Sequence, residues 1–170
     1  MNQFKITVLG MATLFAFAVS ADAQRRTTPA KPKVVTTNTV AASATEVKSA
    51  SEKVSIQIKN TTKFLYLLGG VAKGIEDLDK DRNANQAARN TNAQNKAALI
   101  KTIQNLRAGM LALEVEFRTK EPLKKHLPLV AGITDLTAQS EDLAAAGRFS
   151  DSGRPLLSLV EKLSDALAAL

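Results

Sequence analysis

Apolar residues recur at steps of three and four along most of this chain, which is the spacing of one face of an α-helix. The first such stripe widens in its second half and ends at Ile75. Ser43 with Glu46 has the spacing of a capping box, and a second such pair follows six residues later, so we expect a long helix that begins at about Thr45. The stripe consists of Val47, Ala50, Val54, Ile58, Thr61, Leu65, Leu68, Ala72 and Ile75.

A polar, asparagine-rich segment follows, and it predicts a turn at about 79–84 and then a second helix. The apolar stripe of this second helix becomes regular from Leu99 and ends before Pro122. A third helix is expected to start between Pro122 and Pro128, with Gly147 as its C-terminal cap.

The last predicted helix follows a turn at 150–153, has Pro155 in its first turn and runs to Leu170. Four amphipathic helices in succession can bury their apolar stripes only against one another. Steps of three and four favour the shallow crossing angles of coiled-coil-like packing. We therefore expect an all-α fold, a four-helix and mostly antiparallel bundle, formed by residues 45–170.

The N-terminus has the pattern of a secretion signal: Lys5, an apolar run at 6–19, and then Ala21 and Ala23 at the two small positions of a cleavage site. The apolar run is too short for a membrane span, which needs about 20 residues. We expect residues 1–23 to be a signal peptide cleaved after Ala23. The mature protein is then periplasmic or secreted, the style of the signal favours a bacterium, and no transmembrane segment is expected after cleavage.

Residues 24–44 are rich in threonine, proline, lysine and alanine, which predicts a disordered arm. The formal net charge of the chain is +7, and it contains no cysteine, so disulfides and thiolate chemistry are excluded. Positive charge in an exported protein can attract a protein or an anionic envelope polymer as partner, and the alternative, which we favour, is that the charge only keeps the protein in solution. Basic residues gather in the arm and in a second cluster, and the predicted contacts are Arg25, Arg26, Lys31, Lys33, Lys120, Lys124 and Lys125.

Nucleic acid is not an expected partner, because the few aromatic residues after position 23 do not alternate with basic residues in a base-stacking pattern. Homo-oligomers are compatible with the two long helices. Gly70 and Gly74 lie four residues apart on one helix face, so we interpret them as a point of close helix packing, with a ligand slot, a local kink or a helix end at Gly70 as alternatives.

Oxygen-bearing side chains alternate at Asp77, Asp79 and Asp81, as at the first positions of a calcium loop. Arg82 and Ala88 stand where that loop needs its glycine and its closing glutamate, so these aspartates are weak metal candidates, and a polar turn is the main interpretation.

No cofactor is expected, and no catalytic residue is assigned. His126 is the sole histidine and is expected at the surface or at a helix end. The pairs Glu114 with Glu116 and Glu141 with Asp142 are interpreted as solvated.

The sequence thus favours a non-enzymatic interaction or structural protein of the bacterial cell envelope. The alternative is a periplasmic chaperone-like bundle that binds apolar ligands, and an enzyme is the least favoured class.

Overall fold

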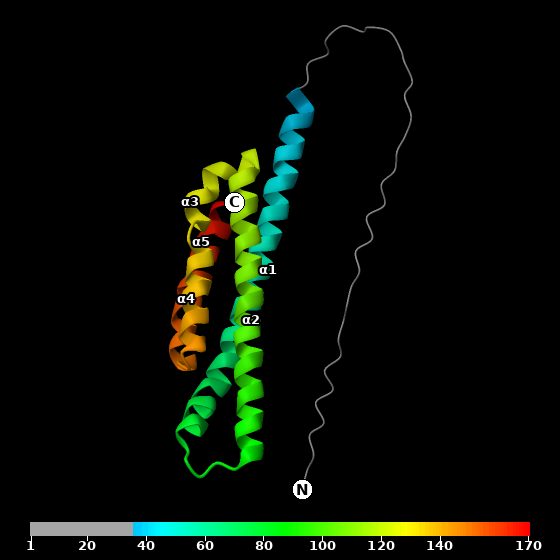
Figure 1. The fold of residues 1–170 in the computed structure, drawn as a ribbon. Coiled ribbons are helices and arrows are strands. Elements are labelled where there is room, and N and C mark those ends of the chain that lie inside the picture. The colour runs from blue at the N-terminus through cyan, green and yellow to red at the C-terminus, as the bar shows by residue number, and fades with distance from the viewer. Residues whose placement is uncertain (1–35) are drawn as a thin grey trace, which may run out of the picture. The chain divides into compact units, whose positions relative to one another are not determined.

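The computed structural model of this protein describes residues 36–170 (Figure 1). The predicted signal peptide, residues 1–23, lies outside the described residues, as do residues 24–35 of the predicted arm. The described part of the chain contains helices and no strand, which confirms the prediction of an all-α protein. The helices are α1 (Thr36–Lys80), α2 (Gln86–Thr119), the 3-10 helix η1 (Glu121–His126), α3 (Leu127–Val130), α4 (Ile133–Ala145) and α5 (Phe149–Ala169).

Helix α1 begins earlier than the capping boxes predict. It starts at Thr36, so residues 36–44 of the predicted disordered arm are helical instead. This segment contains neither proline nor glycine, and three of its residues are alanine, the strongest helix former. The helix continues without interruption through Gly69, Gly70 and Gly74, and it is 45 residues long.

Each of the four longest helices packs against two of the other three. Helix α1 contacts α2 and α5, and α4 contacts the same two helices. In the view of Figure 1, α1 and α4 run downward whereas α2 and α5 run upward. The largest fully buried apolar side chains are Phe117, Phe149, Ile103, Met110, Leu123, Ile133, Leu156, Leu159, Leu163, Val54 and Val130.

The predicted third helix is divided into two. The short α3 ends at Val130, and α4 begins after Gly132, whose φ of 87° is left-handed and suits glycine. The predicted cap at Gly147 is confirmed. Its N–H donates to the Ala144 carbonyl and the Arg148 N–H to the Leu143 carbonyl, which together form a Schellman motif.

The predicted turn at 150–153 is wrong, because α5 already begins at Phe149 and Pro155 lies inside the helix. Phe149 is fully buried and anchors this first turn in the core. The Ser152 N–H donates to the Arg148 carbonyl, and the Ser152 hydroxyl donates to the Phe149 carbonyl. Core burial and these bonds override the turn-forming tendency of the Ser-Asp-Ser-Gly sequence.

Candidate interaction surface

The three aspartates with calcium-loop spacing bind separate partners. Asp77 pairs with Lys73, Asp79 pairs with Lys96 at 2.6 Å, and Asp81 accepts a bond from the Asn83 N–H at 2.8 Å. Asp77 and Asp79 lie in α1, where residues two apart point to different sides of the helix, so their carboxylates do not converge. No group of three or more acidic or histidine side chains within residues 36–170 is placed to hold a metal ion.

The basic residues predicted to contact an anionic partner fall into two groups. Arg25, Arg26, Lys31 and Lys33 lie outside the described residues. The second group lies at the junction of α2 and η1, where Lys120 and Lys124 are paired with carboxylates.

Lys125 has no ion-pair partner among residues 36–170. It lines a groove of about 720 Å³ between α1 and η1, together with Lys48 and Leu170. His126 is partly exposed at the end of η1. Of the three described lysines, Lys125 is therefore the one whose charge is not already neutralised by a neighbour.

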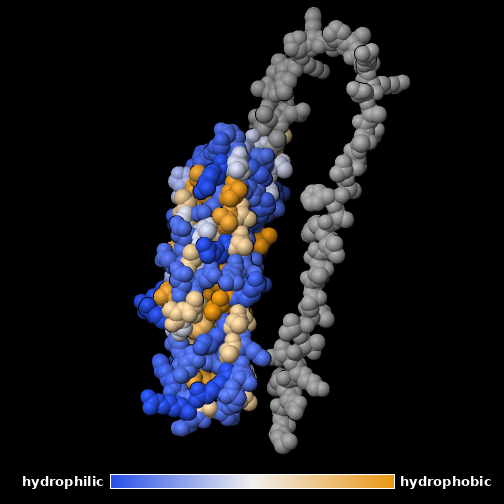
Figure 2. Space-filling model, in the orientation of Figure 1, coloured by the Kyte–Doolittle hydropathy of each residue, from blue (hydrophilic) through white to orange (hydrophobic). Residues whose placement is uncertain are grey.

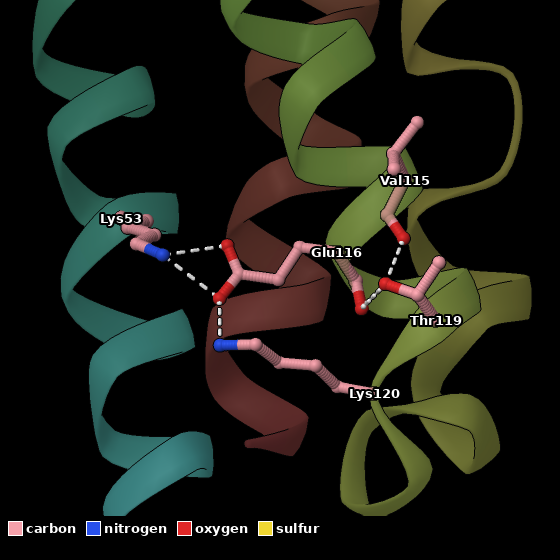
Figure 3. Close-up of polar contacts among 5 residues, drawn as sticks. All are labelled: Lys53, Val115, Glu116, Thr119 and Lys120. Carbon is pink, nitrogen blue, oxygen red and sulfur yellow. Dashed lines mark hydrogen bonds and ion pairs between the residues drawn. The ribbon is translucent and has the colours of Figure 1, made fainter.

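Glu116 is the centre of an ion-pair cluster that joins α1 to α2 (Figure 3). Lys53 of α1 lies 2.7 Å from one carboxylate oxygen, and Lys120 lies 2.6 Å from the other. Burial raises the pKa of Glu116, but the hydrogen bonds from Lys120 and Lys53 outweigh burial and hold the pKa below its ordinary value. The interpretation of Glu116 as solvated is wrong, since its side chain is only 12% exposed.

Glu114 caps the start of α4 from the neighbouring helix. Its carboxylate accepts bonds from the Gly132 N–H at 2.6 Å and from the Thr134 hydroxyl at 2.8 Å. Glu114 is buried, so the interpretation as a solvated residue is wrong here too. The sequence did contain a sign of this burial, because Glu114 lies four residues after Met110 and three before Phe117 on the apolar stripe of α2. A carboxylate buried on such a stripe needs hydrogen-bond donors.

Glu141 also binds other side chains. It accepts a bond from Gln104 at 3.0 Å and pairs with Arg107 at 3.1 Å, so it links α4 to α2. The hydrogen bond from Gln104 and the nearby Arg107 charge lower the pKa of Glu141. Glu114, Glu116 and Glu141 therefore each bind different neighbouring groups, whereas Asp142 is exposed, as predicted.

Gly70 and Gly74 do not pack against another helix of this chain. Both are exposed, and a Cβ built at either position meets no atom within 4 Å outside its own helix. The predicted close helix packing is therefore absent, because the glycines lie on the side of α1 that faces away from the core. A glycine that does receive a close contact is Gly109, where a built Cβ would lie 2.8 Å from the Gln57 amide.

The side of α1 that carries these glycines also exposes large apolar side chains. Tyr66 is 83% exposed, Leu67 is 60% exposed and Val71 is 43% exposed. Figure 2 shows apolar residues at the surface among the more numerous hydrophilic ones. We call this exposed side of α1 the outer α1 face. It consists of Ile56, Lys59, Lys63, Tyr66, Leu67, Gly70, Val71 and Gly74.

A shallow depression of about 660 Å³ lies on this face. Its lining comes from α1 alone and includes Ile58, Lys63, Tyr66 and Leu67. Such an apolar, open surface on one helix fits contact with another macromolecule better than enclosure of a small molecule.

Charge on this part of α1 has a single sign. No Asp or Glu occurs between Glu52 and Glu76, whereas this stretch contains four lysines. Lys53 and Lys73 are engaged by Glu116 and Asp77. The other two, Lys59 and Lys63, have no ion-pair partner within residues 36–170, so they are available to an anionic group from outside.

In addition to the depression on the outer α1 face, an apolar groove lies between α1 and α5. It has a volume of about 260 Å³, and Leu65, Gly69, Gly153 and Leu157 form part of its lining. Gly153 opens this groove, since a Cβ built there would already touch Leu65 and Leu68 at 3.6 Å.

Comparison of the chain with protein-family models, with curated proteins and with solved structures finds no match. Within the described part of the chain, no helix has the length and apolar content to cross a membrane.

Proposed function

We propose that this chain is an exported, non-enzymatic interaction protein of the bacterial cell envelope, which binds a partner protein through the outer α1 face. The observation that carries the proposal is the exposed side of α1, where Tyr66, Leu67 and Val71 lie on a stretch without acidic residues. Exposed apolar side chains grouped on one helix face are typical of protein-binding surfaces.

The proposal includes a mostly antiparallel four-helix bundle as the support for this face. The buried side of α1 contacts α2 and α5, and Lys53 and Glu76 attach it to these helices through Glu116 and Ser150. A helix held on its inner side presents its outer side in a fixed geometry, which lowers the entropy cost of binding.

A non-enzymatic role is supported by the way the less exposed carboxylates are used. Glu116 is neutralised by two ammonium groups, and Glu114 is occupied by the donors of Gly132 and Thr134. A general acid or base must instead have a free position toward the reacting atom.

Export is proposed from the sequence of residues 1–23, which lie outside the described residues. The mass of the protein recovered from the cell envelope tests it, because cleavage after Ala23 leaves a chain that begins at Gln24. A chain that retains residues 1–23 would contradict this part of the proposal.

Site-specific photo-crosslinking in the organism that makes the protein tests the binding face. A photoreactive amino acid at Leu67 should join the chain to a partner protein, whereas the same group at Glu161, an exposed position on α5, should not. Equal crosslinking at both positions, or none at Leu67, would contradict the proposal. Crosslinking to a second copy of this chain would identify a homo-oligomer instead.

A second candidate function is the binding of small apolar molecules in the groove between α1 and α5. The observation that favours it is the gap at Gly153, next to Leu157, which is 56% exposed. Gly153→Leu should fill the groove and abolish binding of a polarity-sensitive dye. Dye binding that persists in this variant would exclude the groove as the site.

An anionic envelope polymer remains the proposed partner of the basic residues. Deleting residues 24–33 and raising the ionic strength should both weaken binding to such a polymer, because exposed charges are screened by salt. Binding that withstands both changes would exclude a charge-driven contact.

A further inference from the structure

We propose that the occupant of the outer α1 face is an acidic amphipathic helix of the partner protein. Its apolar side would lie on Leu67, Val71 and the two glycines, and its carboxylates would lie beside Lys59 and Lys63. This inference rests on the proposed function and specifies the chemistry of the partner.

Charge complementarity argues for an acidic occupant. Lys59 and Lys63 flank the apolar residues of the face and lack ion-pair partners within residues 36–170. Of the two long helices that flank α1, α2 has no Asp or Glu between Gln86 and Leu113, and the acids of α5 are Asp151, Glu161 and Asp165, none of which pairs with Lys59 or Lys63. An acidic partner supplies the missing counter-charges, and such complementarity increases association rates and specificity.

The same charges disfavour a second copy of this face. Two copies packed face to face in parallel would place Lys59 and Lys63 beside the same lysines of the partner, and in either orientation the stretch 53–75 offers them no acid. Like charges across an interface oppose association. A different chain with acidic residues is therefore the better occupant.

The shape of the face favours a helix over a flat lipid surface. Gly70 and Gly74 form a low strip between Tyr66, Leu67 and Val71, and a Cβ at either glycine would meet nothing within 4 Å outside its own helix. Insertion into lipid gains free energy from apolar area, which a glycine does not supply. A second helix gains from the low strip, because small residues let two helix backbones approach closely.

The length of the face sets the length of the partner segment. Ile56 to Gly74 spans roughly 28 Å at the rise of an α-helix, so a partner helix of about 20 residues covers it. The helicity of an isolated peptide varies with its length and with temperature, so probes for this face carry a covalent helix staple that fixes the helix.

The test is an NMR titration of the full chain with three stapled helical peptides that share one leucine and alanine face. Their flanking positions are all glutamate, all glutamine or all lysine. We expect the glutamate peptide to shift amide signals of residues 56–74, the glutamine peptide to bind about tenfold more weakly, and the lysine peptide not to bind. Lipid vesicles of phosphatidylglycerol form a fourth arm and should leave these signals unchanged.

Two pairs of substitutions distinguish the effect of the charge on the outer α1 face from the effect of the net charge of the protein. Lys59→Gln with Lys63→Gln should lower the affinity for the glutamate peptide about tenfold and reduce the salt dependence of this binding. Lys101→Gln on α2 with Lys162→Gln on α5 removes the same total charge away from this face and should leave the affinity unchanged. Equal losses in both pairs would overturn the inference, because general attraction would then explain binding.

Three other outcomes would also overturn it: equal binding of the glutamate and glutamine peptides, no shift at residues 56–74 with any peptide, or a response to vesicles in place of peptides. The proposed function fails separately, when Leu67 crosslinks to no protein in the cell. A crosslink from Leu67 to a segment without acidic residues would retain the proposed function and reject the acidic helix.

Discussion

The Glu76 side chain of α1 accepts a hydrogen bond from the backbone N–H of Ser150 at 2.7 Å, so a residue near the end of one helix caps the start of another. Arg148, at the N-cap position of α5, makes no such bond with its own side chain. The carboxylate also lies at the positive end of the α5 dipole, which favours negative charge. Glu76 therefore replaces the local cap that the α5 sequence lacks.

Removing this cap should destabilise the fold. We expect Glu76→Ala to lower the free energy of unfolding by about 1 kcal/mol, which is typical of a lost helix cap. Glu76→Gln should recover most of the loss, because its amide oxygen still accepts a bond. Urea unfolding measures both, with the exposed Glu52→Ala as the control. Equal stabilities of Glu76→Ala and Glu52→Ala would contradict a capping role.

Glu114 should contribute more to the stability of the fold than Glu76, because it is buried and accepts hydrogen bonds from two donors. We expect Glu114→Ala to lower the free energy of unfolding by about 2 kcal/mol, since it leaves the Gly132 N–H and the Thr134 hydroxyl without their acceptor. Hydrogen exchange of the Gly132 amide should accelerate in the same variant.

A double-mutant cycle isolates the contact between Glu114 and Thr134. Thr134→Val should cost stability in the native background but little in the Glu114→Ala background, because its partner is already gone. Additive effects of the two substitutions would show that the two side chains act independently.

Thr61 offers a stabilising substitution. Its side chain is fully buried in α1, and its hydroxyl has no hydrogen-bond partner among the described residues. Thr61→Val replaces the hydroxyl by a methyl group of similar size, so we expect a gain of about 1 kcal/mol. Thr62→Val, one residue along on the exposed side, should change stability little. A loss of stability in Thr61→Val would reveal a bond to the hydroxyl.

Glu116 makes the stability of the fold depend on pH. Its pKa is lower in the folded chain than in the unfolded chain. The stability it contributes is therefore complete above the unfolded pKa of about 4.3 and is lost as the pH falls through the folded pKa.

Lys53→Met with Lys120→Met should raise the pKa of Glu116 above its ordinary value, because burial then acts without the two ammonium groups. Carboxyl NMR titration measures this pKa. The same variant should lose the part of the acid dependence of unfolding that comes from Glu116. A Glu116 pKa that stays low would mean that other groups hold the carboxylate.

Most of the helical pattern could be predicted from the sequence, because each apolar stripe records which side of a helix is buried. The position of Met110 on such a stripe agrees with its complete burial. The start of α5 could not be predicted, since it depends on Phe149 entering the core and on Glu76, which lies more than seventy residues earlier. Local turn propensity contains no information about such distant contacts.

The glycines illustrate a signal that was present but misinterpreted. Gly70 lies two residues from Leu68 and two from Ala72, both on the buried stripe, so helix geometry places it on the opposite side. Its spacing from Gly74 correctly indicated a shared face, but the stripe indicated that this face points outward.

Comparison of Gly70→Ala with Gly69→Ala tests the central claim most directly. Both glycines are exposed in α1, and an added Cβ meets nothing within 4 Å at either, but Gly69 lines the groove toward α5. Each variant should gain about 1 kcal/mol of stability, because alanine replaces glycine inside a helix. Crosslinking from Leu67 should fall in Gly70→Ala and persist in Gly69→Ala, whereas equal crosslinking in the two variants would contradict a partner helix on the outer α1 face.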